Sequence, residues 1–105
     1  KGLAYLVACD SDTFLLLGGE FGISLKEFPQ YNDLHQDYTL EEGDIVYLKQ
    51  KNKKASKAYE TYVVRDGDSM HSIAQKFGIR LSNLYKMNKK NGEYVPEVGD
   101  ELRLR

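Results

Sequence analysis

The feature that most constrains this chain is an internal repeat. The stretch "FGISL" at 21–25 returns as "FGIRL" at 77–81, which is 56 positions later. The same spacing aligns further identical residues with no gap up to the C-terminal end. A match this long at one fixed spacing indicates two copies of one unit. The further pairs include Val7 and Val63, Asp12 and Asp68, Asn32 and Asn88, Tyr38 and Tyr94, Gly43-Asp44 and Gly99-Asp100, and Leu48 and Leu104.

The repeat predicts two small domains in a chain of 105 residues, which could otherwise form one ordinary domain. We expect repeat 1 at residues 1–48, a lysine-rich linker at 49–58 and repeat 2 at 59–105. Cys9 is the only cysteine, so a disulfide within the chain is excluded. No signal peptide opens the sequence and no stretch approaches the roughly 20 apolar residues of a membrane span. The abrupt start predicts a fragment of a longer protein.

Charge is unevenly distributed along the chain. Residues 1–48 carry two lysines and nine acidic residues, a net charge of −7. Residues 49–58 carry five lysines and no acid, whereas 59–105 carry eight basic and seven acidic residues. The overall charge of −1 argues against a general attraction to nucleic acid. The lysine-rich stretch has no apolar periodicity and predicts a solvated linker, with a basic docking strip as the alternative.

The second copy reads as strand, helix, helix, strand. Residues 61–65 are β-branched and aromatic, as in a short strand, and 66–69 supply a turn and a helix cap. Apolar residues then follow helical spacing over 70–77 and again over 81–88, while 100–105 alternate as in a half-buried strand. We predict an α+β chain of two small βααβ repeats. In each, two helices cover a two-stranded antiparallel sheet, because two strands alone are unstable in water.

The first copy departs from this pattern in its helices. Leu15 and Leu16 stand where the second copy has a histidine and a serine, so the first helix is apolar nearly all round. Such a helix is usually covered on more than one side. Gly18-Gly19 lies inside this helix, where each glycine costs about 1 kcal/mol relative to alanine, and Pro29 lies inside the next. We expect repeat 1 to be degenerate and to lean on a neighbour.

The motifs of the second copy resemble those of a LysM domain. Gly67-Asp68-Ser69 precedes a helix that contains Ile73-Ala74 and ends in Phe77-Gly78-Ile79, and a second helix ends in Asn88. Pro96 departs mildly, since the family often has leucine there. The first copy is similar more weakly, because Ser11 replaces the motif's first glycine. Together the two copies resemble the tandem LysM tail of bacterial cell-wall hydrolases such as glucosaminidases and amidases.

The resemblance implies a non-catalytic module that binds glycans containing N-acetylglucosamine, either peptidoglycan or chitin. Such a module would anchor an attached cell-wall hydrolase in a bacterial cell envelope, on the periplasmic or extracellular side, and would pack against that catalytic domain. The lack of paired cysteines favours a bacterial origin. We expect neither a cofactor nor a metal ion. The alternative is a protein–protein docking or assembly module that binds no glycan.

The resemblance also places the glycan site in two loops of the second copy. Apolar side chains there would pack on the C–H faces of a sugar, and backbone groups in glycine-containing loops would bond the acetamide. Three members also have a structural reading: Met70 as core, Ser69 as helix cap, and Tyr94, which aligns with Tyr38, as a loop support. The expected glycan-binding residues are Gly67, Asp68, Ser69, Met70, Asn91, Gly92, Tyr94, Val95 and Pro96.

A catalytic reading of the chain is weak. His71 follows Ser69 on an exposed helix start, and nucleophile, base and orienting group need a shared pocket. With two histidines and one cysteine, the chain lacks a cysteine–histidine metal cluster. We expect no catalytic residue and no metal ligand, and we expect Asn32 and Asn88 to bond the loop backbone.

Overall fold

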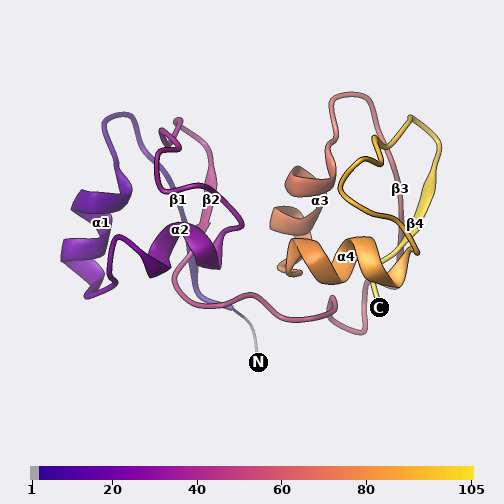
Figure 1. The fold of residues 1–105 in the computed structure, drawn as a ribbon, viewed down its shortest axis with the longest axis horizontal. Helices are drawn as coiled ribbons and strands as arrows, with labels where there is room; N and C mark the ends of the chain where they lie inside the picture. Colours follow the sequence, from indigo (N-terminus) through magenta and orange to yellow (C-terminus); the bar gives the residue numbers. More distant parts are fainter. Residues whose placement is uncertain (1–2) are drawn as a thin grey trace. The chain divides into compact units, whose positions relative to one another are not determined.

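The computed structural model describes residues 3–105 and divides the chain into two compact units. Unit 1 runs through Lys51, and unit 2 is Asn52–Arg105. Both are small α+β units with the same order of elements (Figure 1). Unit 1 contains β1 (Tyr5–Val7), α1 (Phe14–Phe21), α2 (Glu27–Tyr31) and β2 (Ile45–Tyr47). Unit 2 contains β3 (Thr61–Val63), α3 (Met70–Phe77), α4 (Leu81–Met87) and β4 (Glu101–Arg103).

The end strands of each unit pair antiparallel, as predicted. Leu6 lies opposite Val46 in the β1–β2 sheet, and Tyr62 lies opposite Leu102 in the β3–β4 sheet. The strands are shorter than the sequence pattern predicts, because the chain bends into loops directly after Val7 and Val63. The pairing continues past β3 at Val64, whose N–H donates to the Asp100 carbonyl at 2.8 Å and whose carbonyl accepts from the Gly99 N–H at 2.9 Å.

The first helix of each unit, α1 and α3, begins and ends at the residues that carry the capping signals. Thr13 and Ser69 accept hydrogen bonds from the Leu16 and Ser72 N–H groups, which satisfies a free donor at each helix start. Gly78 follows α3 with φ of 69°, the left-handed conformation in which glycine has no steric penalty. Pro29 fits in the first turn of α2, where a backbone donor is not needed.

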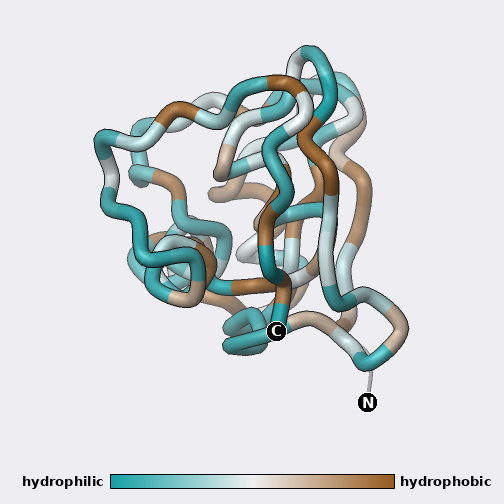
Figure 2. The backbone as a smooth tube through the Cα atoms, turned by 90° about the vertical axis from the view of Figure 1, so that its right-hand side faces the viewer, coloured by the Kyte–Doolittle hydropathy of each residue, from teal (hydrophilic) through white to brown (hydrophobic). Residues whose placement is uncertain are grey.

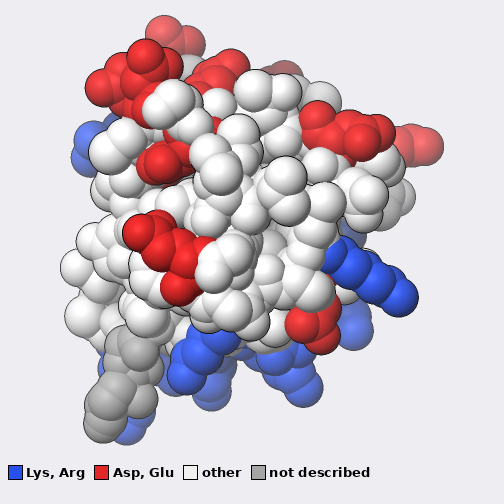
Figure 3. Space-filling model, turned by 90° about the vertical axis from the view of Figure 1, so that its left-hand side faces the viewer, with Lys and Arg blue, Asp and Glu red and all other residues white. Residues whose placement is uncertain are grey.

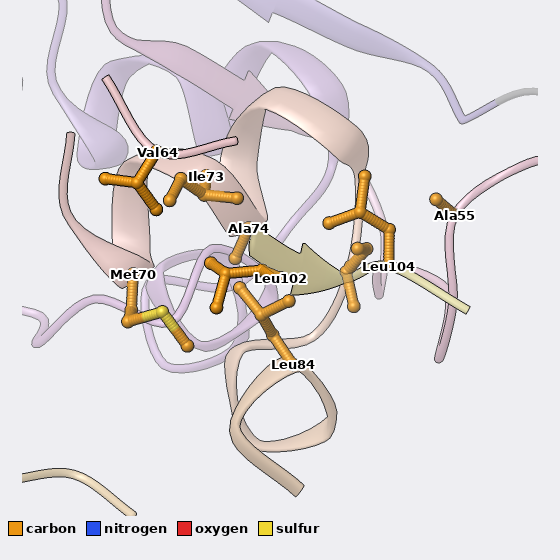
Figure 4. Packing of buried hydrophobic residues seen from close by; sticks show 9 residues of the cluster. Ala55, Val64, Met70, Ile73, Ala74, Leu84, Leu102 and Leu104 are labelled. Carbon is orange, nitrogen blue, oxygen red and sulfur yellow. The ribbon is translucent and has the colours of Figure 1, made fainter. Parts of the chain in front are cut away.

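The core of unit 2 lies between its sheet and its two helices. Ile73 and Ala74 of α3, Leu84 of α4 and Leu102 of β4 converge there, each at most 2% exposed (Figure 4). Met70 belongs to the same cluster. Along the backbone in Figure 2, hydrophobic stretches alternate with hydrophilic loops. Over residues 3–105, no helix has the length and apolar character needed to cross a membrane.

The core of unit 1 is built around two aromatic rings. Phe14 and Phe28 meet edge to face, with ring centroids 5.1 Å apart. Gly18 is required here, because a Cβ atom on it would lie 2.5 Å from the Ile23 carbonyl oxygen. Leu15 and Leu16 point away from this core and are 66% and 64% exposed. Their cover by a neighbour stays a prediction.

The lysine-rich segment is less solvated than its sequence indicates. The Lys51 side chain is fully buried, with its Nζ atom 2.7 Å from an Asp33 carboxylate oxygen. Burial lowers the pKa of Lys51, and the hydrogen bond to Asp33 opposes that shift. Ala55 is 4% exposed, and its N–H bonds the Leu104 carbonyl at 2.8 Å. The sequence did not indicate these contacts, because they are made by one ion pair and one alanine and not by a periodic run of apolar residues. The boundaries 1–48, 49–58 and 59–105 stay a prediction.

Candidate functional site

Two loops of unit 2 lie at the same end of its sheet (Figure 1). The first, residues 64–69, joins β3 to α3, and the second, residues 88–100, joins α4 to β4. Their bases are tied by two backbone hydrogen bonds. The Val64 N–H donates to the Asp100 carbonyl at 2.8 Å, and the Gly99 N–H donates to the Val64 carbonyl at 2.9 Å. The residues expected on the two sides of a glycan site therefore come from adjacent loops.

The first loop is organised by Asp68. Its carboxylate accepts a hydrogen bond from the Arg65 N–H at 2.8 Å and from the Tyr62 hydroxyl at 2.6 Å. The tyrosine bond, more than any other cause, lowers the pKa of Asp68 and keeps the carboxylate ionised. Gly67 precedes it with φ of 88°, exposed, and a Cβ atom on it would meet nothing within 4 Å. Asp68 therefore shapes the loop, while Gly67 presents bare backbone to solvent.

The second loop is organised by Asp100 in the same way. Its carboxylate accepts from the Tyr94 hydroxyl at 2.5 Å and from the Glu97 N–H at 3.0 Å. These two bonds lower the pKa of Asp100, and the hydrogen bond to Asp100 raises the pKa of Tyr94 to about 12. The Lys90 Nζ lies 4.6 Å from the centroid of the Tyr94 ring. Tyr94 thus supports the loop, as the structural reading expects, with its hydroxyl and its ring both engaged.

The tip of the second loop exposes backbone and apolar side chains. The Asn91 side chain accepts from the Glu93 N–H at 2.9 Å and so shapes a turn around the exposed Gly92. Val95 is 76% exposed, next to the partly exposed Pro96. Val98 is 68% exposed, although the sequence argument did not select it. The sequence did carry a signal for Val98. Val95 and Val98 are apolar residues in a segment of turn residues, and they do not follow the alternating pattern of a strand.

The structure does not bring Met70 to this surface. Met70 is 2% exposed and its side chain lies in the core beside Leu84 and Leu102 (Figure 4). Met70 is therefore a core residue, as its helical spacing also allowed. Ser69 caps α3, and its backbone N–H in turn donates to the Ser72 hydroxyl at 2.9 Å. Ser69 and Asn91 are exposed as well. We call the exposed or partly exposed backbone and apolar positions Gly67, Gly92, Val95, Pro96 and Val98 the loop surface.

Asn88 fixes the start of the second loop. Its side-chain amide donates to the Leu84 and Arg103 carbonyls, each at 2.9 Å, and its oxygen accepts from the Arg103 N–H at 2.7 Å. One side chain thereby ties the end of α4 to β4. The prediction that Asn88 bonds the backbone is confirmed.

Unit 1 repeats this scheme with substitutions. The Tyr38 hydroxyl donates to Asp44 at 2.8 Å, and this bond is the main cause that raises the pKa of Tyr38 to about 12. Ser11 occupies the position of Gly67 with φ of 76°, a left-handed conformation that is strained for a residue with a Cβ atom.

A surface pocket of about 470 Å³ lies along α2 of unit 1 and the chain that follows it. Its lining is Lys26, Pro29, Gln30, Leu34, His35, Gln36 and Asp37.

Residues 3–105 hold no group of three or more histidine, cysteine, aspartate or glutamate side chains that could bind a metal ion. His71 is half-buried on the first turn of α3, and the neighbouring Ser69 hydroxyl is engaged in the helix cap.

The chain is similar to a known domain family and to several bacterial proteins. A family model described as "LysM domain" matches residues 62–105. The "Membrane-bound lytic murein transglycosylase D" of Escherichia coli is 29% identical over 100 residues, covering 89% of this chain and 21% of the relative. The "Probable peptidoglycan endopeptidase LytE" of Bacillus subtilis is 30% identical over 97 residues, covering 83% and 29%. The chain thus spans less than a third of these relatives. The crystal structure of the Bacillus cereus spore cortex-lytic enzyme SleL is also similar. The alignment covers 100% of this chain and 23% of the SleL chain, with a TM-score of 0.43 and 23% sequence identity.

Proposed function

We propose that this chain binds N-acetylglucosamine-containing glycans of peptidoglycan through the loop surface of unit 2, because residues 62–105 match the family model of the LysM domain, a binding domain. Similarity to bacterial cell-wall lytic enzymes supports peptidoglycan, with chitin as a related ligand. In this proposal the chain is a tandem LysM module that holds an attached hydrolase on its substrate. It works in the cell envelope, on the periplasmic or extracellular side.

The observation that carries the proposal is the character of the loop surface. Val95 and Val98 are 76% and 68% exposed, while the Asn91 and Asp100 side chains of the same loop accept hydrogen bonds from its backbone. Exposed apolar side chains suit the C–H faces of a pyranose and the methyl of its acetamide group. The exposed backbone at Gly67 and Gly92 suits the amide of the same group.

We further propose that the two units contribute unequally. Gly67 allows close approach of a ligand to the backbone, whereas Ser11 places a side chain at the corresponding position of unit 1. Residues 1–48 also carry a net charge of −7, which is unfavourable for a wall polymer that is often anionic. Two equal sites on one chain would raise avidity by about 10²–10⁴, so unequal units predict a much smaller gain on long glycans.

The test is an NMR titration of the full chain with a chitin oligomer and with soluble peptidoglycan fragments. We expect shifts at residues 66–69 and 89–98. We expect Val95→Ser to weaken binding about fivefold, since a partly buried apolar contact contributes about 1 kcal/mol. Val63→Ser is the matched control, because Val63 is 53% exposed on a strand outside the loops.

Two outcomes would reject this assignment. One is the absence of shifts with both ligands. The other is a set of shifts centred on residues 35–37 of unit 1, which line the pocket beside α2 and would make that unit the working site. Retention of the chain on insoluble peptidoglycan, lost in Val95→Ser but kept in Val63→Ser, would support binding to the intact polymer.

A further inference from the structure

The outward side of α1 presents two leucines with a glycine between them. Leu15 and Leu16 are 66% and 64% exposed, while Phe14 and Leu17 on the opposite side are 3% and 6% exposed. Gly19 is exposed and lies four positions after Leu15 and three after Leu16, so the three share one side of the helix. We call Leu15, Leu16 and Gly19 the α1 face.

The fold of unit 1 explains Gly18 but does not explain Gly19. A Cβ atom at Gly18 would collide with the Ile23 carbonyl oxygen, whereas a Cβ atom at Gly19 would meet nothing within 4 Å. An exposed helical glycine costs about 1 kcal/mol relative to alanine. In α3 the three positions matching the α1 face hold polar residues, namely His71, Ser72 and Gln75. Two exposed leucines around an unneeded glycine fit close approach by another polypeptide.

Charge indicates what kind of polypeptide fits this surface. Glu20 lies beside Leu16 on α1, and Asp10 and Asp12 precede the helix. Figure 3 shows the side of the molecule that carries α1, where acidic groups border uncharged surface. Unit 1, which runs through Lys51, has a net charge of −5, whereas unit 2, residues 52–105, carries eleven basic and seven acidic residues, a net of +4. Each copy of the chain therefore contains a unit whose net charge is opposite to that of unit 1.

We propose that the α1 face docks on the net-positive unit 2, residues 52–105, of a second copy of this chain. A symmetric contact of two α1 faces would bring two surfaces of like charge together, which disfavours it. The favoured contact is head to tail, and such contacts build open chains of molecules when the rotation does not close. The small apolar patch predicts a weak association. This inference is independent of glycan binding.

Sedimentation of the full chain tests the proposal. The monomer mass is 12.0 kDa. At about 0.01 M salt, where the Debye length is about 30 Å, we expect the weight-average mass to rise with protein concentration. At about 1 M salt, where the Debye length is about 3 Å, we expect the monomer mass. A monomer at every concentration in low salt would overturn the proposal. Association that survives high salt would overturn the charge-guided arrangement.

Two variants locate the contact. Leu15→Ser/Leu16→Ser removes both exposed side chains without touching the core, and we expect it to abolish the rise in mass. Leu25→Ser is the matched control, because Leu25 is 39% exposed in the same unit but outside α1. Association that is unchanged in the double variant, or equally lost in the control, would show that α1 is not the contact.

Gly19→Ala separates docking from a structural role. The added Cβ has open space within unit 1, and alanine favours the helix, so we expect a higher melting temperature. The same methyl group would block close approach, so we expect self-association to weaken at least severalfold. A more stable variant that associates as the parent chain does would refute close approach at Gly19.

Discussion

Units 1 and 2 share a polar framework and differ in almost everything placed on it. Asn32 bonds the Phe28 and Tyr47 carbonyls and the Tyr47 N–H, just as Asn88 bonds Leu84 and Arg103. An aspartate beside the second strand accepts from a tyrosine hydroxyl in each unit. These few bonds join the last helix, the long loop and the closing strand. The architecture therefore depends on buried or loop-bound polar groups, while the outer surfaces are free to diverge.

The divergence is clearest around the second phenylalanine of the repeat. Phe77 packs against Tyr59 and Tyr62, with ring centroids 5.4 Å and 5.3 Å away. In unit 1 the position of Tyr62 is held by Leu6, and Phe21 is 47% exposed. Leu6 also lacks the hydroxyl that Tyr62 donates to Asp68. Unit 2 therefore has extra support for its first loop, whereas unit 1 has the buried pair of Lys51 and Asp33.

The largest effect should come from breaking that pair. Asp33→Asn keeps a residue type that tolerates the observed φ of 55° but removes the charge opposite the buried Lys51. We expect unit 1 to lose about 3–5 kcal/mol, because an uncompensated charge stays buried. Denaturant unfolding followed by NMR signals from each unit measures this loss.

Lys89→Asn is the control for this prediction, since Lys89 occupies the corresponding position of unit 2 with φ of 58° and is exposed. It should change stability by less than about 0.5 kcal/mol. Equal effects of the two variants would mean that backbone conformation, and not the ion pair, sets the stability of this turn.

A smaller difference is expected between the two asparagines. Asn32→Ala leaves the Tyr47 N–H without its side-chain acceptor in a site where Asn32 is 0% exposed. Asn88→Ala makes the same change in unit 2 where water has access. We expect a loss of about 2–3 kcal/mol for Asn32→Ala and about 1 kcal/mol for Asn88→Ala. A larger loss for Asn88→Ala would show that burial does not rank these bonds.

The smallest predicted effect concerns the left-handed turn that precedes each first helix. Ser11→Gly relieves a side chain held at φ of 76° and should stabilise unit 1 by about 1 kcal/mol. Gly67→Ser should destabilise unit 2 by a similar amount and should also weaken glycan binding. Melting curves and the chitin-oligomer titration measure both. A loss of binding in Ser11→Gly but not in Gly67→Ser would reverse the proposed roles of the units.

Much of the fold could be predicted from local patterns. Helical spacing in Met70, Ile73, Ala74 and Phe77 gave α3, because one apolar side of a helix must face a core. The left-handed Gly78 after that helix follows from the same local reasoning. The spacing could not separate Met70 as a core residue from Met70 as a ligand contact, since both uses need an apolar side chain at the helix start. Val98 was missed because the exposure of a loop side chain is set by the fold, and two valines in a segment of turn residues were the only local signal.

By itself the sequence determined the repeat, the order of elements in each unit and the likeness of the second copy to LysM domains. These depend on residue type and spacing, which are local properties. Only the tertiary structure decided that Lys51 is buried against Asp33, that Val95 and Val98 are exposed, and that Leu15 and Leu16 point away from the core. Burial of this kind depends on segments distant in sequence. A lysine in a basic stretch looks solvated until the chain folds a carboxylate next to it.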